Sequence, residues 1–319
     1  MATIARMPLA LSVIWTNLLL FNISNQHSPA AIEEDRINKP HRPLPSGRLT
    51  PKDARQLLLY IAPIAMGIGW AAEVQEETQL LIGFTWMYND LGGSDEHWVL
   101  RNALIALGYG LFSSAALRIM AGPSHKLTPT GFHWICLITV VMFVTQQICD
   151  IKDAKGDKLR GRKSAPIVLG DECVRWSVAV PILFCSVWCA WFLELGLRSH
   201  MSILAMGGLV AFRILVYRDL KSDKLTWKLW ALWTCGLFAL PLLNNPEVFV
   251  RAWSEAKIFI WEVRCMLCTG NECSTALNLA AVSGVASLIE GKRVIGRLIG
   301  KPVNGTIEAG EVFIEDSIR

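Results

Sequence analysis

Residues 130–166 read TGFHWICLITVVMFVTQQICDIKDAKGDKLRGRKSAP, and no other part of the chain says more about its architecture. About twenty residues at the start of this segment are nearly all apolar, and an α-helix of that length crosses the hydrocarbon core of a bilayer. The rest is strongly charged, with acidic residues at 150, 153 and 157 among many lysines and arginines. This abrupt change predicts a membrane-spanning helix that leads into a charged segment at one membrane face.

The composition of the whole chain supports a membrane protein. Of 319 residues, 52% are hydrophobic and only 18% are charged, and the mean hydropathy is +0.37. Soluble domains carry about 25% charged residues, so this composition argues against a soluble enzyme. The net charge is +4, without the basic face of a nucleic-acid-binding protein. The nine cysteines lie mostly in apolar segments, which argues against a disulfide framework.

Apolar segments of about the length of a membrane span recur along the chain. Eight are found, at about 7–25, 55–73, 78–89, 101–121, 130–149, 175–197, 199–217 and 226–244, and the third is short. We therefore predict an all-α, polytopic helix bundle of about eight spans over residues 1–244. Residues 245–319 are expected to form a C-terminal tail, to which we assign no chemistry.

The distribution of basic residues predicts the orientation of the bundle. If all eight segments cross, one side holds the loops 26–54, 90–100, 150–174 and 218–225. Lysine and arginine are concentrated there, whereas the opposite side holds only Arg6, Arg118, Lys126 and Arg198. The positive-inside rule places the basic loops in the cytoplasm. We expect a multi-pass integral membrane protein, in the endoplasmic reticulum if the cell is eukaryotic, with the lipid bilayer as its surroundings.

Two polar clusters lie in these loops. In the first, Asn22, Asn25 and Gln26 are spaced as one helix face, and unpaired amides at that depth are expected to face a cavity rather than lipid. The loop continues with charged and amide side chains at Glu33, Glu34, Asp35, Asn38, Lys39 and Arg42. In the second cluster the acidic residues form one stripe of a helix and are followed by basic ones, namely Asp150, Asp153, Asp157, Lys158, Arg160 and Arg162.

Paired acidic and basic clusters suit a metal-bound diphosphate. Magnesium binds through one or two carboxylates together with substrate phosphates, and Lys and Arg neutralise the remaining phosphate charge. The metal stabilises the charge that develops as the C–O bond breaks. We therefore expect an isoprenyl diphosphate as substrate, with its hydrocarbon tail inside the bundle. A basic loop alone would instead reflect topology or contact with anionic lipid, but two acidic stripes favour the diphosphate.

At these residues the chain resembles the UbiA superfamily of intramembrane prenyltransferases. The segment DRINKPHRPLPSGR at 35–48 is similar to the stretch after that family's first aspartate-rich motif. The segment DIKDAKGDKLRGRKSAP at 150–166 is similar to its second motif. The resemblance implies a ring of nine helices around a central cavity that is capped by polar loops. Because that family has one helix before its first motif, we expect this chain to lack the first helix.

The first motif departs from the family pattern, which begins Asn-Asp-x-x-Asp and has a third Asp four residues later. Here amides occupy 22, 25 and 26, and Asp35 follows ten residues after Asn25. This variant is similar to a fungal branch that includes membrane-bound sesquiterpene cyclases. The loop YNDLGGSD at 88–95, with Arg101 and Asn102, also resembles that branch and is expected to cap the cavity.

The resemblance implies a role for each polar residue. The expected ligands of Mg²⁺ or of its waters are Asn22, Asn25, Asp35, Asp150, Asp153 and Asp157. The expected diphosphate-binding residues are Lys39, Arg42, Lys158 and Arg162, with Asn38 ordering the first loop. The expected reaction is cyclisation of farnesyl diphosphate to a sesquiterpene hydrocarbon. Two alternatives stay open: transfer of the isoprenyl cation to an aromatic or lipid acceptor, and an inactive membrane scaffold.

Carbocation chemistry also calls for aromatic faces in a dry pocket, since each cation–π contact contributes about 0.5–2 kcal/mol. Tryptophans within the predicted spans are candidates for these aromatic faces, in particular Trp15, Trp70, Trp86 and Trp134. Trp also collects at membrane interfaces regardless of function, so the sequence alone assigns none of them to the pocket.

Overall fold

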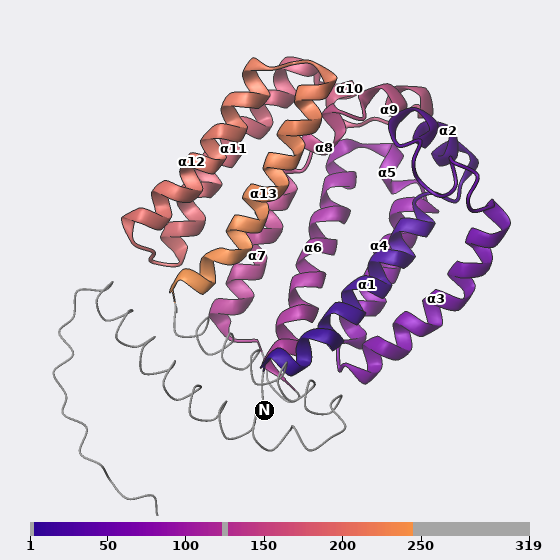
Figure 1. Cartoon of the computed structure of the whole chain (residues 1–319), viewed down its shortest axis with the longest axis horizontal. Coiled ribbons are helices and arrows are strands. Elements are labelled where there is room, and N and C mark those ends of the chain that lie inside the picture. Colours follow the sequence, from indigo (N-terminus) through magenta and orange to yellow (C-terminus); the bar gives the residue numbers. More distant parts are fainter. Residues whose placement is uncertain (1–2, 123–126, 245–319) are drawn as a thin grey trace, which may run out of the picture. The chain divides into compact units, whose positions relative to one another are not determined.

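The computed structural model describes residues 3–122 and 127–244, and the tail that we predict at 245–319 lies outside them. The described residues form thirteen α-helices and one short 3-10 helix, with no strand among them (Figure 1). Eight helices are long: α1 (Met7–Ser24), α3 (Pro51–Ala71), α4 (Gln75–Asn89), α6 (Trp98–Ala121), α7 (Pro129–Thr145), α11 (Asp171–Phe192), α12 (Leu197–Val216) and α13 (Leu220–Asn244). They coincide with the eight predicted apolar segments, which confirms the all-α prediction.

Six of the described helices are long and apolar enough to cross a membrane: α1, α6, α7 continued to Ile151, α11, α12 and α13. The helix α4 has 15 residues and, at 1.5 Å per residue, reaches only about 22 Å. That length is short of a hydrocarbon core of about 30 Å. The helix α3 begins with Lys52, Asp53 and Arg55 in its first turns. Crossing by these two helices therefore stays a prediction.

The outward surface of the bundle is apolar. Large side chains such as Trp70, Leu59 and Trp191 are 75%, 68% and 68% exposed. In water such a surface would be strongly unfavourable, whereas hydrocarbon chains solvate it. This surface is the one expected of an integral membrane protein.

Five short helices gather at one end of the bundle, at the top of Figure 1. They are α2 (Pro29–Asn38), α5 (Gly93–Glu96), α8 (Ile148–Ile151), α9 (Ala154–Arg160) and α10 (Ala165–Leu169). The helix α2 packs on α9, and α10 packs on α6, α8 and α9. The loops that parity assigns to one side therefore do share one end of the bundle, and the cytoplasmic orientation of that end stays a prediction.

The two halves of the bundle differ in packing. The helices α7, α11, α12 and α13 enclose a dense core in which Val141, Ile182 and Trp233 are fully buried. The Trp233 indole N–H donates to the Ser186 hydroxyl at 2.9 Å, so this half also has satisfied polar contacts across helices. The helices α1 and α6 contribute to a smaller buried cluster that includes Val13 and Ala115. Together with α4 they line a cavity, and this half carries the candidate site.

Candidate active site

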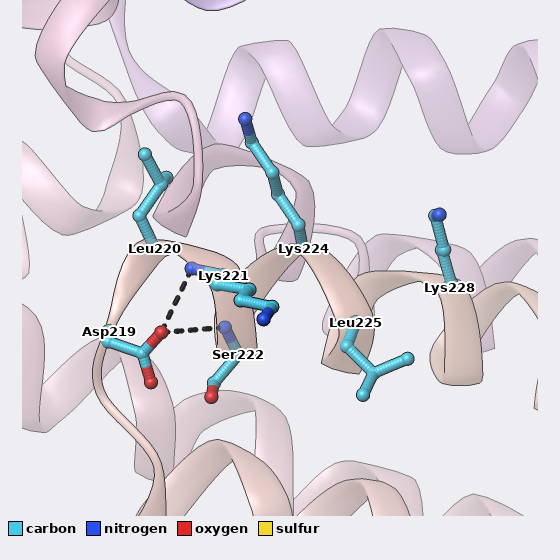
Figure 2. Close-up of a pocket in the computed structure, with 7 residues that line it drawn as sticks. All are labelled: Asp219, Leu220, Lys221, Ser222, Lys224, Leu225 and Lys228. Atoms are coloured by element: carbon cyan, nitrogen blue, oxygen red, sulfur yellow. Dashed lines mark hydrogen bonds between the residues drawn. The ribbon is translucent and has the colours of Figure 1, made fainter.

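A hollow of about 880 Å³ lies at the start of α13. Figure 2 shows Lys224 and Lys228 extending from the same side of this helix. Asp219, its one acidic residue, accepts hydrogen bonds from the backbone N–H groups of Lys221 and Ser222 at 3.0 Å. No aspartate of either motif lines this hollow, so it is separate from the predicted site.

A smaller cavity of about 400 Å³ lies between α1, α4 and α6. Aromatic and aliphatic side chains form most of its wall: Ile14, Leu18, Phe21, Leu81, Phe84, Tyr88, Leu104, Ile105, Tyr109 and Phe112. Asn17, Asn25, Thr85 and Gly108 complete it. None of the four candidate tryptophans lines it: Trp15, Trp70 and Trp86 are exposed, and Trp134 is buried against Phe192. Phenylalanine and tyrosine supply the aromatic faces instead.

At one end of this cavity a buried arginine meets the second acidic motif. Arg101 of α6 donates from Nη2 to Asp150 Oδ1 at 2.6 Å, and its guanidinium lies 6.0 Å from the ring of the cavity residue Tyr88. Asp150 and Asp157 are 2% and 0% exposed. Asp157 accepts from Arg162 Nη1 at 3.4 Å. The acidic motif thus begins where the apolar cavity ends.

Several buried polar atoms at this point have no hydrogen-bond partner. They are Arg101 Nη1, Asp150 Oδ2 and Asp157 Oδ2, and Gln26 Oε1, just beyond the end of α1, is also buried and unpaired. Buried polar groups are nearly always paired in folded proteins, and unpaired ones call for an explanation. An anion and a cation bound together would satisfy the free donor of Arg101 and the free carboxylate oxygens of Asp150 and Asp157.

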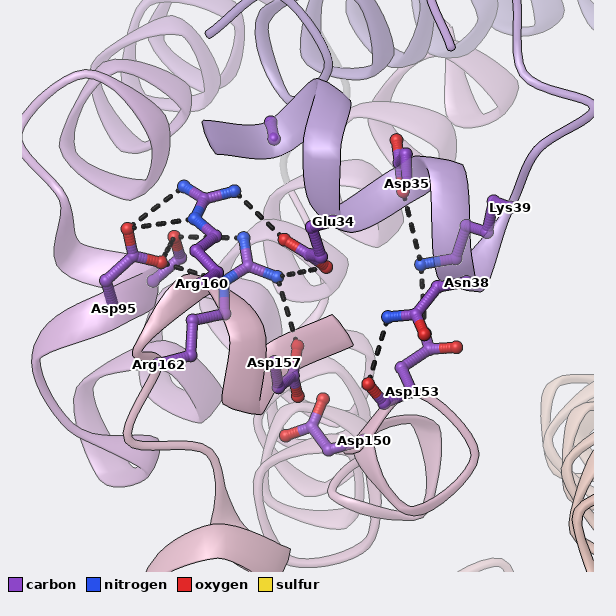
Figure 3. Close-up of polar contacts among 12 residues, drawn as sticks. Glu34, Asp35, Asn38, Lys39, Asp95, Asp150, Asp153, Asp157, Arg160 and Arg162 are labelled. Carbon is purple, nitrogen blue, oxygen red and sulfur yellow. Dashed lines mark hydrogen bonds and ion pairs between the residues drawn. The ribbon is translucent and has the colours of Figure 1, made fainter. Parts of the chain in front are cut away.

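The first loop meets the second motif at Asp153, as Figure 3 shows. Lys39 Nζ lies 2.9 Å from Asp153 Oδ2, and Asn38 Nδ2 donates to the Asp153 backbone carbonyl at 2.9 Å. A Cβ added at Gly156 would lie 2.2 Å from Asn38 Nδ2, so a glycine is required for this approach. Burial acts to raise the pKa of Asp153, but Lys39 and Lys152 outweigh it and hold the pKa below its ordinary value.

A second set of ion pairs joins three elements around Arg160 and Arg162 (Figure 3). Arg162 donates to Glu34 of α2 at 2.9 Å and to Asp95 of α5 at 2.7 Å. Arg160 donates to the same two carboxylates at 3.1 and 3.0 Å. Burial acts to raise the pKa of Asp95, but the two arginines together lower it. The loop that we expect to cap the cavity is thereby tied to the second motif.

The structure brings most of the predicted residues together. Asp35 is 2% exposed and pairs with Arg42 at 2.7 Å and Lys39 at 3.9 Å. Lys158 is exposed and forms no ion pair within the described residues. Arg101, Arg160, Glu34 and Asp95 all lie in the clusters or the loop that the sequence identifies, but the sequence predicts no metal-binding or phosphate-binding role for any of them.

The three amides of the first motif do not share one environment. Asn25 is half-buried and lines the cavity, and Gln26 is buried. Asn22 is exposed and donates to the Leu18 carbonyl of its own helix at 2.8 Å. The expected common face is therefore wrong for Asn22. The reason is local: α1 ends at Ser24 with Asn25 as its C-cap, so Gln26 lies beyond the helix and helical spacing no longer relates its direction to that of Asn22.

Within the described residues, no group of three or more His, Cys, Asp or Glu side chains is placed to hold a metal ion without further ligands. Magnesium needs only one or two protein carboxylates when phosphate and water supply the other oxygens. The free oxygens of Asp150 and Asp157 fit that requirement. Asp35 and Asp153 are engaged by lysine and arginine in this structure, and they hold the basic residues in place.

The model of the UbiA prenyltransferase family matches residues 6–238. The chain belongs to the UbiA prenyltransferase family. It is 29% identical to somaliensene A/B synthase of Streptomyces somaliensis over 70% of this chain and 76% of that protein. It is 30% identical to fumagillin beta-trans-bergamotene synthase of Aspergillus fumigatus over 71% of this chain and 77% of that protein. A solved structure of digeranylgeranylglyceryl phosphate synthase superposes with a TM-score of 0.51 at 19% identity, over 76% of this chain and 86% of that one. This similarity supports the fold alone.

Membership of this family makes the protein an integral membrane enzyme related to both terpene cyclases and prenyltransferases. The loops at the polar end of the bundle carry the family's two motif regions, and the cavity between α1, α4 and α6 lies directly beside them.

Proposed function

We propose that this protein is a membrane-bound terpene cyclase that ionises farnesyl diphosphate with Mg²⁺ and closes the chain to a sesquiterpene hydrocarbon. One observation carries the proposal. Unpaired, buried atoms of Arg101, Asp150 and Asp157 lie at the polar end of an apolar cavity with aromatic walls. A diphosphate with its metal suits the first environment, and an isoprenyl chain suits the second.

Each residue has a proposed task. Asp150 and Asp157 bind Mg²⁺ through their free oxygens, with Asn25 of the first motif as a further oxygen ligand. Asn22 is exposed and is not among these ligands. Lys39, Arg42, Arg162 and the free Nη1 of Arg101 bind phosphate oxygens, and Lys158 adds positive charge from the surface. Asp35 and Asp153 hold Lys39 near the site, and Asn38 anchors the first loop to Asp153. When bound, Mg²⁺ neutralises the charge that builds up on the leaving diphosphate.

The reaction needs no external acceptor. The C–O bond of the allylic diphosphate breaks, and its electron pair leaves with the diphosphate. The π electrons of a more distant double bond then form a C–C bond to the allylic carbon, which moves the positive charge to a tertiary carbon. Loss of a proton from the neighbouring carbon to the released diphosphate gives the hydrocarbon. The cavity excludes water, which would otherwise capture the cation.

The acceptor-using reaction is the main rival, because it shares the ionisation step. The relatives named as synthases of somaliensene and bergamotene support cyclisation. The description of the family, as prenyltransferases, supports transfer. The amide-substituted first motif, which resembles the fungal cyclases, favours the cyclase.

The test is an acceptor-free assay. Membranes that contain the protein are incubated with farnesyl diphosphate, with and without Mg²⁺, and the headspace is analysed by gas chromatography–mass spectrometry. We expect a magnesium-dependent C15 hydrocarbon from the wild type and none from Asp150→Asn, which has nearly the same shape. Product that appears only after an aromatic or lipid acceptor is added would overturn cyclisation in favour of transfer. No diphosphate release under either condition would favour the inactive scaffold.

A further inference from the structure

Asn17 is a polar residue in the middle of the membrane-spanning helix α1, and none of the roles above involves it. It is 3% exposed and lines the cavity together with apolar residues of the same helix, Ile14, Leu18 and Phe21. Its side-chain N–H donates to the Val13 carbonyl at 2.9 Å. Its carbonyl oxygen, Oδ1, is buried and has no hydrogen-bond partner.

This pattern does not fit a residue that joins helices. Polar side chains in membrane helices usually hydrogen-bond to a neighbouring helix, whereas the hydrogen bond of Asn17 stays within α1. The adjacent Thr16 also bonds within α1, but its polar group is paired: the hydroxyl donates to the carbonyls of Ser12 and Val13 at 2.8 and 3.2 Å. An unpaired polar group in a membrane interior is costly and marks a functional site.

The position of Asn17 along α1 relates it to the chain of the substrate. It precedes Asn25, at the polar end of the cavity, by eight residues, which correspond to about 12 Å along a helix. That distance is roughly the reach of a farnesyl chain built from C–C bonds of about 1.5 Å. With the allylic carbon beside Asp150, the remote double bonds would lie near Asn17.

We propose that Asn17 is a specificity-determining residue, whose carbonyl oxygen stabilises the positive charge that ring closure places on the distal part of the isoprenyl chain. The carbonyl oxygen carries a partial negative charge, and a dipole acts strongly in apolar surroundings. It favours attack by the distant double bond over direct loss of a proton from the first allylic cation. Each route releases diphosphate and one proton, taken from a different carbon, and only the first route forms a C–C bond. The inference rests on the proposed cyclase function.

The test separates ionisation from ring closure. Asn17→Leu replaces the amide by an apolar side chain of similar size, and Thr16→Val is the matched control on the same helix outside the cavity lining. Diphosphate release and the ratio of cyclic to linear C15 products are measured together. For Asn17→Leu we expect release within about two-fold of the wild type and a cyclic-to-linear ratio lowered about ten-fold, the effect of one lost polar interaction. Thr16→Val should leave the ratio unchanged.

A third variant and a stability measurement keep the result decisive. Asn17→Gln retains the carbonyl but moves it by one methylene, and we expect it to alter the product mixture without abolishing cyclisation. Asn17→Leu should unfold at the same temperature as the wild type or higher, because it removes an unpaired buried oxygen. An unchanged product ratio in Asn17→Leu, or a loss of release in proportion to cyclisation, would overturn the inference alone. A wild type that releases diphosphate without any hydrocarbon would overturn the proposed function as well.

Discussion

Removing the charge of Arg101 should destabilise the protein far more than removing the Arg101–Asp150 pair as a whole. The two atoms of this ion pair lie 2.6 Å apart, and the side chains are 10% and 3% exposed. In Arg101→Met the Asp150 carboxylate would stay buried without a cation, next to Asp157. Breaking such a pair by removing one partner costs about 3–5 kcal/mol. At about 2–4 °C per kcal/mol for a chain of this size, the melting temperature should fall by roughly 10 °C.

The double variant Arg101→Met with Asp150→Asn removes both charges and should recover most of this loss. Melting temperatures in detergent and diphosphate release are measured for both single variants and the double variant. All three should lack ionisation, because each loses a group that we place at the diphosphate. A double variant as unstable as Arg101→Met would refute the reasoning, since the cost would then not come from an unpaired charge.

Arg175 offers a matched control for the same chemistry away from the cavity. It is 2% exposed and pairs with Asp223 at 2.9 Å between α11 and α13. Arg175→Met should lower the melting temperature by a similar amount and leave the activity of the folded fraction intact. Loss of activity there would mean that ionisation depends on general stability rather than on the buried site.

Three further predictions test other contacts. Gly156→Ala should displace Asn38, because the added Cβ would lie 2.2 Å from Asn38 Nδ2, and it should lower the free energy of unfolding by about 1–3 kcal/mol. The control Gly83→Ala has open space around the added Cβ and should raise the free energy of unfolding by up to about 1 kcal/mol, as measured in a melting assay. Gly108→Leu should fill the cavity without a clash at Cβ, and we expect it to reduce turnover of farnesyl diphosphate while the melting temperature is retained. The pKa of Asp153 is lower in the folded state than its ordinary value of about 4. The ionised carboxylate therefore contributes stability at pH values above its ordinary pKa, and this contribution is lost as the pH falls through the folded-state pKa. The stability difference between the wild type and Asp153→Asn should accordingly stay constant from pH 7 to about 5 and shrink below about 4, as measured by melting temperature against pH.

Local patterns in the sequence were sufficient for the helices and for the two motif regions. An apolar run of about twenty residues has few ways to fold other than as a helix in lipid, which is why all eight segments are helical. These successes depend on signals within one segment.

The parts that sequence reasoning missed depend on contacts between distant segments. Arg101 and Asp150 are 49 residues apart, and Arg162 and Glu34 are 128 apart. Helical spacing says which residues share one helix face, but not which faces meet. The same limit applies to the cavity, because its aromatic walls come from three helices and no single segment identifies Phe84 or Phe112 as lining residues.

The distribution of unpaired atoms separates two kinds of polar residue in this bundle. Glu34, Asp35, Asp95 and Asp153 have their carboxylates engaged by basic side chains, so they contribute to the shape of the polar end even without a ligand. Asp150, Asp157 and Arg101 each keep one buried atom free, and folding alone does not explain that cost. A bound diphosphate with its metal would remove the cost. The same criterion applied elsewhere along the cavity selects Asn17, the residue that we propose to act in ring closure.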